Sequence, residues 1–182
     1  RTRDYTFDYE KQPSRAMFKY KQAFIRNDQE RYMTFLNNVL QGKATLHADN
    51  VAPYELIRPY MTWNWNGPSL ETMSKSEKDA LNASWASLLD FCSDEDMLAV
   101  VDTSGSMHSS YGLPAAVALS LGLYLAEHNK GRFRNHFIEF SERPQLIRLK
   151  GETFVDKLRY ILTFDEIADT NLEAVFQLIL CV

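Results

Sequence analysis

The sequence has few cysteines, no excess of positive charge and no long apolar run. Its two cysteines, Cys92 and Cys181, are too few and too far apart for a disulfide framework or a zinc cluster, which favours a reducing compartment. With 20 basic against 24 acidic residues and a net charge of −4, no global positive field attracts nucleic acid. We therefore expect a cytoplasmic protein.

The most apolar stretch, residues 113–126, is shorter than the roughly 20 residues that a membrane-spanning helix needs. It predicts a buried helix, and we expect no membrane partner. A hydrophobic fraction of 45% and a charged fraction of 24% are those of an ordinary globular protein. A packed fold of 182 residues follows, either as one domain or as a smaller domain with a helical extension.

Residues 1–92 are expected to form an α-helical region, because helical spacing occurs there and strand-like alternation does not. Asn27 or Asp28 can cap a helix that ends at Gly42, and Pro53 suits the first turn of another. Ser74 or Ser76 can begin a third helix that reaches Cys92, with a core-facing stripe of Leu81, Trp85, Leu88 and Leu89. The loop at residues 59–69 is expected to pack Trp63 and Trp65 on a neighbouring helix.

Residues 93–182 alternate strands and helices, which predicts a Rossmann-like, doubly wound α/β domain. The apolar run at residues 97–101 indicates a buried strand, a polar loop spans 102–112, and Pro114 opens an apolar helix through His128. Residues 133–141 and 145–149 predict a hairpin. Thr153 with Asp156, and Thr170 with Glu173, resemble capping boxes that begin two further helices.

The loop after the first strand is the strongest chemical signal. Asp102, Ser104 and Ser106 form a D-x-S-x-S pattern at the carboxyl end of the strand, where doubly wound sheets collect ligands. A carboxylate and two hydroxyls suit a hard divalent cation, magnesium first and calcium or manganese as alternatives. Such a cation keeps water and can accept an acidic group from a protein partner. The competing interpretation is an Asx or Ser turn without any ion.

Residues 97–107 resemble the metal-ion-dependent adhesion site (MIDAS) of von Willebrand factor A (vWA) domains. The resemblance implies a Rossmann-like vWA fold, a non-enzymatic binding function and a further metal ligand, Thr170, whose other role is as a helix cap. It also implies an aspartate after the next strand, which this sequence lacks. We therefore expect residues 93–182 to be the N-terminal part of a vWA domain, completed by a segment after Val182 or by a second chain.

More narrowly, residues 102–107 and 138–144 resemble an uncharacterised family related to the Ro autoantigen. That family joins a TROVE-like helical region to an A domain. Residues 26–56 are similar to this helical region through Tyr32, Phe35, Leu36, Gly42, Lys43 and Pro53. The resemblance implies that residues 1–92 are TROVE-like and offers structured RNA as a second partner.

Two alternative functions remain open. In the first, RNA stacks on the aromatic residues Tyr5, Phe7, Tyr9, Phe18, Tyr20 and Phe24, which lie among Arg3, Lys11, Arg15, Lys19, Lys21 and Arg26. The simpler interpretation of this mixture is an extended arm that packs its rings on its host.

In the second alternative, a phosphoryl-transfer hydrolase uses Asp102 as its nucleophile, although Ser104 stands where such enzymes commonly place a second carboxylate. The Gly-x-Ser-x-Gly and P-loop motifs are absent. We therefore expect a binding protein rather than an enzyme. His108, His128, Glu139 and Asp169 receive no assigned role.

Overall fold

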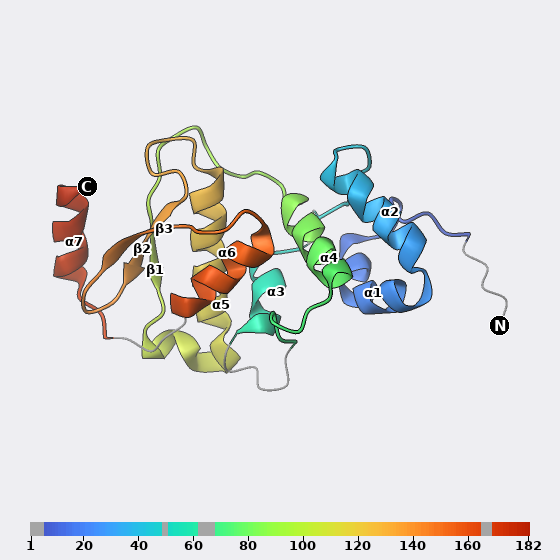
Figure 1. Cartoon of the computed structure of the whole chain (residues 1–182). Coiled ribbons are helices and arrows are strands. Elements are labelled where there is room, and N and C mark those ends of the chain that lie inside the picture. Colours follow the sequence, from blue (N-terminus) through green and yellow to red (C-terminus); the bar gives the residue numbers. More distant parts are fainter. Residues whose placement is uncertain (1–5, 49–50, 62–67, 165–168) are drawn as a thin grey trace. The chain divides into compact units, whose positions relative to one another are not determined.

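The computed structural model describes residues 6–48, 51–61, 68–164 and 169–182 (Figure 1). The predicted positions of Arg3, Tyr5, Trp63 and Trp65 lie outside these described residues. Contacts divide the chain into two compact units. One comprises Arg1–Ala52 with Glu71–Leu89, and the other comprises Pro53–Leu70 with Asp90–Val182.

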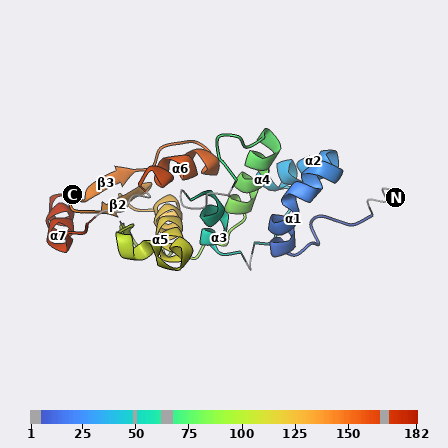
Figure 2. The ribbon, with the colours of Figure 1, turned by 90° about the horizontal axis from the view of Figure 1, so that it is seen from below.

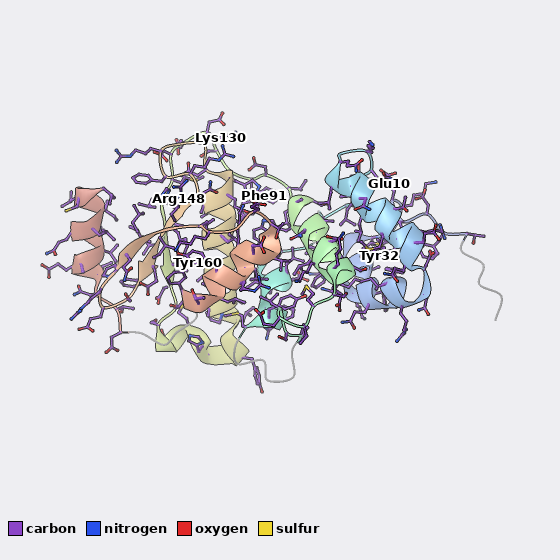
Figure 3. All side chains as sticks on the ribbon, in the orientation of Figure 1. Glu10, Tyr32, Phe91, Lys130, Arg148 and Tyr160 are labelled. Carbon is purple, nitrogen blue, oxygen red and sulfur yellow. The ribbon has the colours of Figure 1, made fainter. Side chains whose placement is uncertain are left out.

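The regular elements of the first unit are all helices in its described residues, as the sequence predicts. Its helices are α1 (Ser14–Asn27), α2 (Gln29–Leu40) and α4 (Lys75–Ala86). Met17, Tyr32 and Leu36 are buried in a shared core that also contains Tyr9, Phe35, Leu46, Ala80 and Ala83. The labelled side chain of Tyr32 lies among these helices in Figure 3. Because this core is apolar and aromatic, burial stabilises the three short helices that would be marginal alone.

The end of α2 follows from local sequence. Asp28 occupies the N-cap position but makes no side-chain cap bond, and the helix ends in a Schellman motif in which Gly42 has a φ of 68°. The N–H of Gly42 donates to the Val39 carbonyl (2.9 Å), and that of Lys43 donates to the Asn38 carbonyl (2.7 Å). The predicted end at Gly42 is confirmed.

Helix α4 begins as predicted but ends earlier. Ser74 and Glu77 form a complete capping box at its start. The predicted continuation to Cys92 is wrong, because the N–H and the hydroxyl of Ser87 both donate to the Ala83 carbonyl and close the last turn. Asp90 Oδ1 then accepts the N–H of Cys92 (2.9 Å), a turn that directs the chain away from the helix.

Helix α1 was not expected as a regular element. The alternative of an extended arm is wrong for residues 14–27, which form a helix. Its N-cap residue, Pro13, makes no side-chain cap bond, and its first turn contains no acidic residue, so the usual start signals are missing. Met17 is buried, and Phe24 and Ile25 pack against the same core. Tertiary burial therefore stabilises a helix that lacks local start signals.

The second unit contains a mixed three-stranded sheet in the order β1-β2-β3. Strand β1 (Ala99–Asp102) is parallel to β2 (His136–Phe140), and β2 is antiparallel to β3 (Gln145–Arg148). The predicted mixed α/β fold and the hairpin are confirmed. The three strands keep their sequence order, so the reversal of strand order that marks a doubly wound sheet does not occur among the described strands.

Helix α5 (Ser109–His128) connects β1 to β2 and packs against both strands. Its first turn is interrupted by Ser110, Tyr111 and Gly112, which have positive φ angles, and the regular helix follows around Pro114. By length and composition alone, the stretch Gly105–His128 could cross a membrane, but half of its apolar window is buried in the protein. The buried core helix of a folded domain has the same length and apolar composition.

The start of β2 is set by a carboxylate. Asp96 accepts hydrogen bonds from the backbone N–H groups of Arg132 (3.1 Å) and Phe133 (3.3 Å) and from Asn129 Nδ2 (3.1 Å). Although desolvation of the exposed Asp96 side chain opposes ionisation, these bonds hold the pKa of its carboxyl below the usual value. Because the bonds keep residues 132 and 133 in a turn, the strand begins at His136, three residues later than predicted.

The remaining elements are short. They are α3 (Pro53–Ile57), the 3₁₀ helices η1 (Arg58–Tyr60), η2 (Gly105–His108) and η3 (Leu162–Phe164), and the helices α6 (Phe154–Ile161) and α7 (Leu172–Cys181). The predicted capping box of Thr153 and Asp156 begins α6. In Figures 1 and 2, α7 stands apart from α5 and α6, and it contacts the unit through β2.

Candidate metal-binding loop

The loop begins where β1 ends, at Asp102. Asp102 Oδ1 accepts the N–H of Ser104 (2.8 Å), and the Ser104 carbonyl accepts the N–H of Met107 (2.9 Å). The first bond is an Asx turn and the second opens the 3₁₀ helix η2. The turn is compatible with both interpretations of the motif, because it fixes the backbone and uses neither Asp102 Oδ2 nor the two serine hydroxyls, which hydrogen-bond to each other.

The hydroxyl groups of Ser104 and Ser106 converge. Their Oγ atoms are 3.2 Å apart, Ser106 is exposed and Ser104 is half-buried. Two oxygens at right angles around Mg²⁺ would lie about 3.0 Å apart, and around Ca²⁺ about 3.4 Å, given metal–oxygen distances near 2.1 and 2.4 Å. The observed separation suits neighbouring ligands of either cation. The donor set therefore fits a hard divalent ion.

The sequence indicated no structural role for two residues of this loop, His108 and Thr103. His108 Nε2 lies 3.2 Å from the Thr103 carbonyl, so the imidazole contacts the loop backbone. Thr103 is 1% exposed, and its Oγ1 makes no hydrogen bond to any described residue. A buried hydroxyl without a partner is uncommon and costly. The loop thus carries an unsatisfied polar group directly beside Asp102.

Thr170 lies at the same edge of the sheet, one strand away. The N–H of the next residue, Asn171, donates to the Ser141 carbonyl (3.2 Å), directly after β2. Asp102 pairs with Phe140 in the sheet register, so Ser141 follows the position opposite the metal motif. Thr170 is exposed, and no hydrogen bond joins it to the motif within the described part of the chain.

The predicted capping role of Thr170 is wrong. Asn171 is the N-cap of α7, and its Oδ1 accepts the N–H of Ala174 (3.0 Å). Asparagine is at least as good an N-cap as threonine, so the cap shifts by one residue. The Thr170 hydroxyl is not needed to begin the helix.

A hollow of about 530 Å³ lies at the carboxyl end of β2. It brings together two acidic residues without an assigned role, Glu139 and Asp169, with Thr163, which the sequence did not single out. The full lining is Glu139, Ser141, Glu142, Arg143, Gln145, Thr163, Phe164 and Asp169. Ser141 Oγ donates to Glu139 Oε2 (2.9 Å), and this bond holds the Glu139 carboxylate beside the end of β2. Spacing in the sequence carried no signal for this grouping, because the residues come from three separate segments.

Other metal chemistry has no support in the described ranges. No group of three or more His, Cys, Asp or Glu side chains lies close enough there to hold an ion. Cys92 and Cys181 are free thiols, and His128 Nδ1 contacts the Tyr124 carbonyl (2.9 Å). A candidate cation site in this part of the chain therefore depends on hydroxyl oxygens with the single carboxylate of Asp102.

Comparison with known proteins places the chain among families of unknown function. The profile of the Domain of unknown function (DUF2828) matches residues 3–98, more than half of the chain, and that of the Domain of unknown function (DUF7788) matches residues 96–182. Neither description names a vWA or TROVE family, so those resemblances stay predictions.

An uncharacterised protein of Acanthamoeba polyphaga mimivirus is 28% identical over 186 residues, which cover 95% of this chain. The chain spans 31% of the length of that relative. No solved structure matches the chain significantly. From the first profile, the chain belongs to the DUF2828 family.

Proposed function

We propose that the chain is a metal-dependent binding module of the vWA type. Asp102, Ser104 and Ser106 would hold a divalent cation, with magnesium preferred over calcium or manganese. Thr170, in the segment before α7 that contacts the end of β2, would add a further oxygen, directly or through water. An acidic group of a protein partner would then occupy a remaining coordination position.

One observation carries the proposal: the Ser104 and Ser106 hydroxyl oxygens lie 3.2 Å apart directly after the strand that ends in Asp102. Without an ion, the two hydroxyls at this distance form a hydrogen bond with each other, in which either can donate. Convergent oxygens separated by this distance suit adjacent ligands of one cation.

Charge supports a binding role for the cation. The motif offers one carboxylate, which under-neutralises a divalent ion and leaves it attractive to an additional anion. A cage of several carboxylates would instead saturate the ion. An acidic side chain of another protein is thus the ligand that this donor set favours.

The proposal assigns no bond-breaking step to the loop. An aspartyl nucleophile commonly needs a second carboxylate two residues later, and that position is Ser104. Asp102 Oδ1 is already bonded to the Ser104 N–H, which suits a ligand or an orienting group. Covalent trapping of Asp102 by a phosphoryl analogue would contradict this assignment.

Metal titration tests the proposal directly. Calorimetry of the chain with Mg²⁺, Ca²⁺ and Mn²⁺ is expected to show one site, and Ser104→Ala and Ser106→Ala are each expected to weaken it tenfold or more. Ser109→Ala is the matched control, because Ser109 is exposed just after η2 and outside the motif. Equal affinity in Ser104→Ala and the unchanged chain would refute the site.

A further inference from the structure

We propose that the outward face of α1 is a binding surface for single-stranded nucleic acid. Arg15, Lys19 and Arg26 would contact phosphates, and the ring of Tyr20, which borders this face beside Lys19, would stack on an unpaired base. This surface belongs to the first unit, so the inference stands independently of the metal loop.

The charge of this segment differs sharply from that of the whole chain. Residues 11–27 contain five basic side chains and no acidic one, a local charge of +5 in a chain whose net charge is −4. The five are Lys11, Arg15, Lys19, Lys21 and Arg26. Because phosphate contacts dominate non-specific nucleic-acid affinity, a local basic surface is sufficient even in an acidic protein.

Helix geometry places three of these charges on one face. Arg15, Lys19 and Arg26 are separated by four and seven residues, which is close to one and two helical turns, and all three are exposed. From Arg15 to Arg26 the helix rises roughly 16 Å, the length over which a stacked strand presents about five phosphates. The three charges can therefore contact one continuous strand.

Lys21 does not belong to this surface. Burial lowers the pKa of its ammonium group, while the nearby Glu77 acts in the opposite direction. Glu77 also accepts hydrogen bonds from Ser74 and from Gln22 Nε2 (3.4 Å). The carboxylate nearest to this part of α1 is thus engaged with α4 and its own cap.

The other nearby carboxylates have partners as well. Asp8 lies 3.7 Å from Lys11 Nζ at the start of the segment. Asp28 accepts from Tyr9 (2.8 Å) and from Arg31 (3.1 Å) beyond the end of α1. No acidic side chain of α1 itself interrupts the face.

Tyr20 supplies the feature that favours a single strand. It is 49% exposed, whereas Phe24 packs against Tyr9 and Tyr32 in the core. Lys19 Nζ lies 5.4 Å from the centroid of the Tyr20 ring, so a cation and an aromatic surface are adjacent. Unpaired bases stack on such rings, while bases of a duplex are not accessible to them.

An anionic membrane suits this face less well. A helix that lies on a bilayer inserts apolar side chains between the lipids. Met17 of α1 is buried, and Phe24 and Ile25 pack on the core of the unit. Tyr20 is then the one exposed aromatic residue of the helix, too little apolar surface for insertion into a bilayer.

Binding of the full chain to fluorescent 12-nucleotide single strands, RNA and DNA, tests the inference by anisotropy between 50 and 200 mM salt. Three phosphate contacts predict a salt slope near −2, so affinity should fall roughly 20-fold over this range. Lys19→Gln/Arg26→Gln should reduce the fall to about 3-fold. The control Lys43→Gln/Lys75→Gln removes the same charge from exposed positions of the same unit and should keep the full slope.

Tyr20 is tested separately. Tyr20→Ala should weaken binding at least about fivefold without changing the salt slope, and Tyr20→Phe should bind normally. Absence of binding at 50 mM salt, or equal loss in both double variants, would refute the surface. Binding of duplex as tight as that of the single strand would show that the face does not select unpaired bases. Tighter binding to anionic phosphatidylserine vesicles would indicate a membrane partner, and either result would overturn the inference.

Discussion

At the scale of single residues, two polar side chains are the most informative. The Thr103 hydroxyl is buried beside the metal motif and has no hydrogen-bond partner among the described residues. The exposed carboxylate of Asp96 accepts three hydrogen bonds that fix the turn before β2. Neither feature follows from residue type alone, because burial and distant segments decide them. Asp102, Ser104 and Ser106, by contrast, are neighbours in the sequence, and their grouping is local.

Tyr32 provides a pH prediction at this scale. It is 3% exposed, and burial raises the pKa of its phenol well above the ordinary value of 10.0. A raised folded-state pKa contributes stability that is intact below pH 10 and lost as pH rises further, because only the unfolded chain then ionises.

The urea midpoint is therefore expected to fall between pH 9 and pH 11, and to fall less steeply in Tyr32→Phe. Circular dichroism at each pH measures it. An identical pH dependence in the variant and the unchanged chain would show that Tyr32 is not responsible.

At the scale of elements, helix boundaries were predictable where the cap is encoded locally. Gly42, Ser74 and Thr153 each act within three or four residues, and each boundary is confirmed. Helix α1 has no such signal, and its basic and aromatic residues also suited an extended arm. Burial of Met17 in the core stabilises the helical conformation, and this burial cannot be predicted from the sequence of the segment alone.

Helix α6 allows a test of local capping. Thr153 Oγ1 accepts the N–H of Asp156 (3.3 Å) and donates to its carboxylate (2.7 Å), which holds the pKa of Asp156 below the usual value. Thr153→Ala is expected to lower the free energy of unfolding by about 1 kcal/mol at neutral pH. Urea denaturation measures this change.

The stabilising contribution of the Asp156 carboxylate should disappear as pH falls through its lowered pKa. The difference in free energy of unfolding between Thr153→Ala and the unchanged chain should therefore narrow in acid. Thr34→Ala, at an exposed position within α2, is the control and is expected to have little effect. A difference that grew in acid would contradict this account of the cap.

At the scale of the whole molecule, the two units present surfaces of different chemical character. The first presents a basic helix face over an aromatic core, and the second presents a hydroxyl-rich loop at a sheet edge. The exposed residues Leu172, Phe176 and Leu180 lie on one face of α7.

Packing of α5 on β1 supports the loop. A Cβ at Gly122 would overlap the Val101 side chain, which precedes Asp102 in the strand. Gly122→Ala is expected to destabilise the protein by 1–3 kcal/mol and to disturb metal affinity through β1. Thermal unfolding and the metal titration measure both effects.

Leu121→Ala, at a position of α5 that is 44% exposed, is the control for general helix effects. A fully stable Gly122→Ala protein would mean that the helix moves away from β1 without penalty.

By itself, the sequence determined the features that depend on near neighbours: the helical character of the first half, three helix boundaries, the mixed α/β character of the second half and the loop motif. Local hydrogen bonds and periodicity encode all of these. The tertiary structure alone decided that α1 forms without local start signals, where β2 begins and which acidic residues line one hollow with Thr163. Those features depend on burial and on contacts between distant segments, which a linear pattern does not contain.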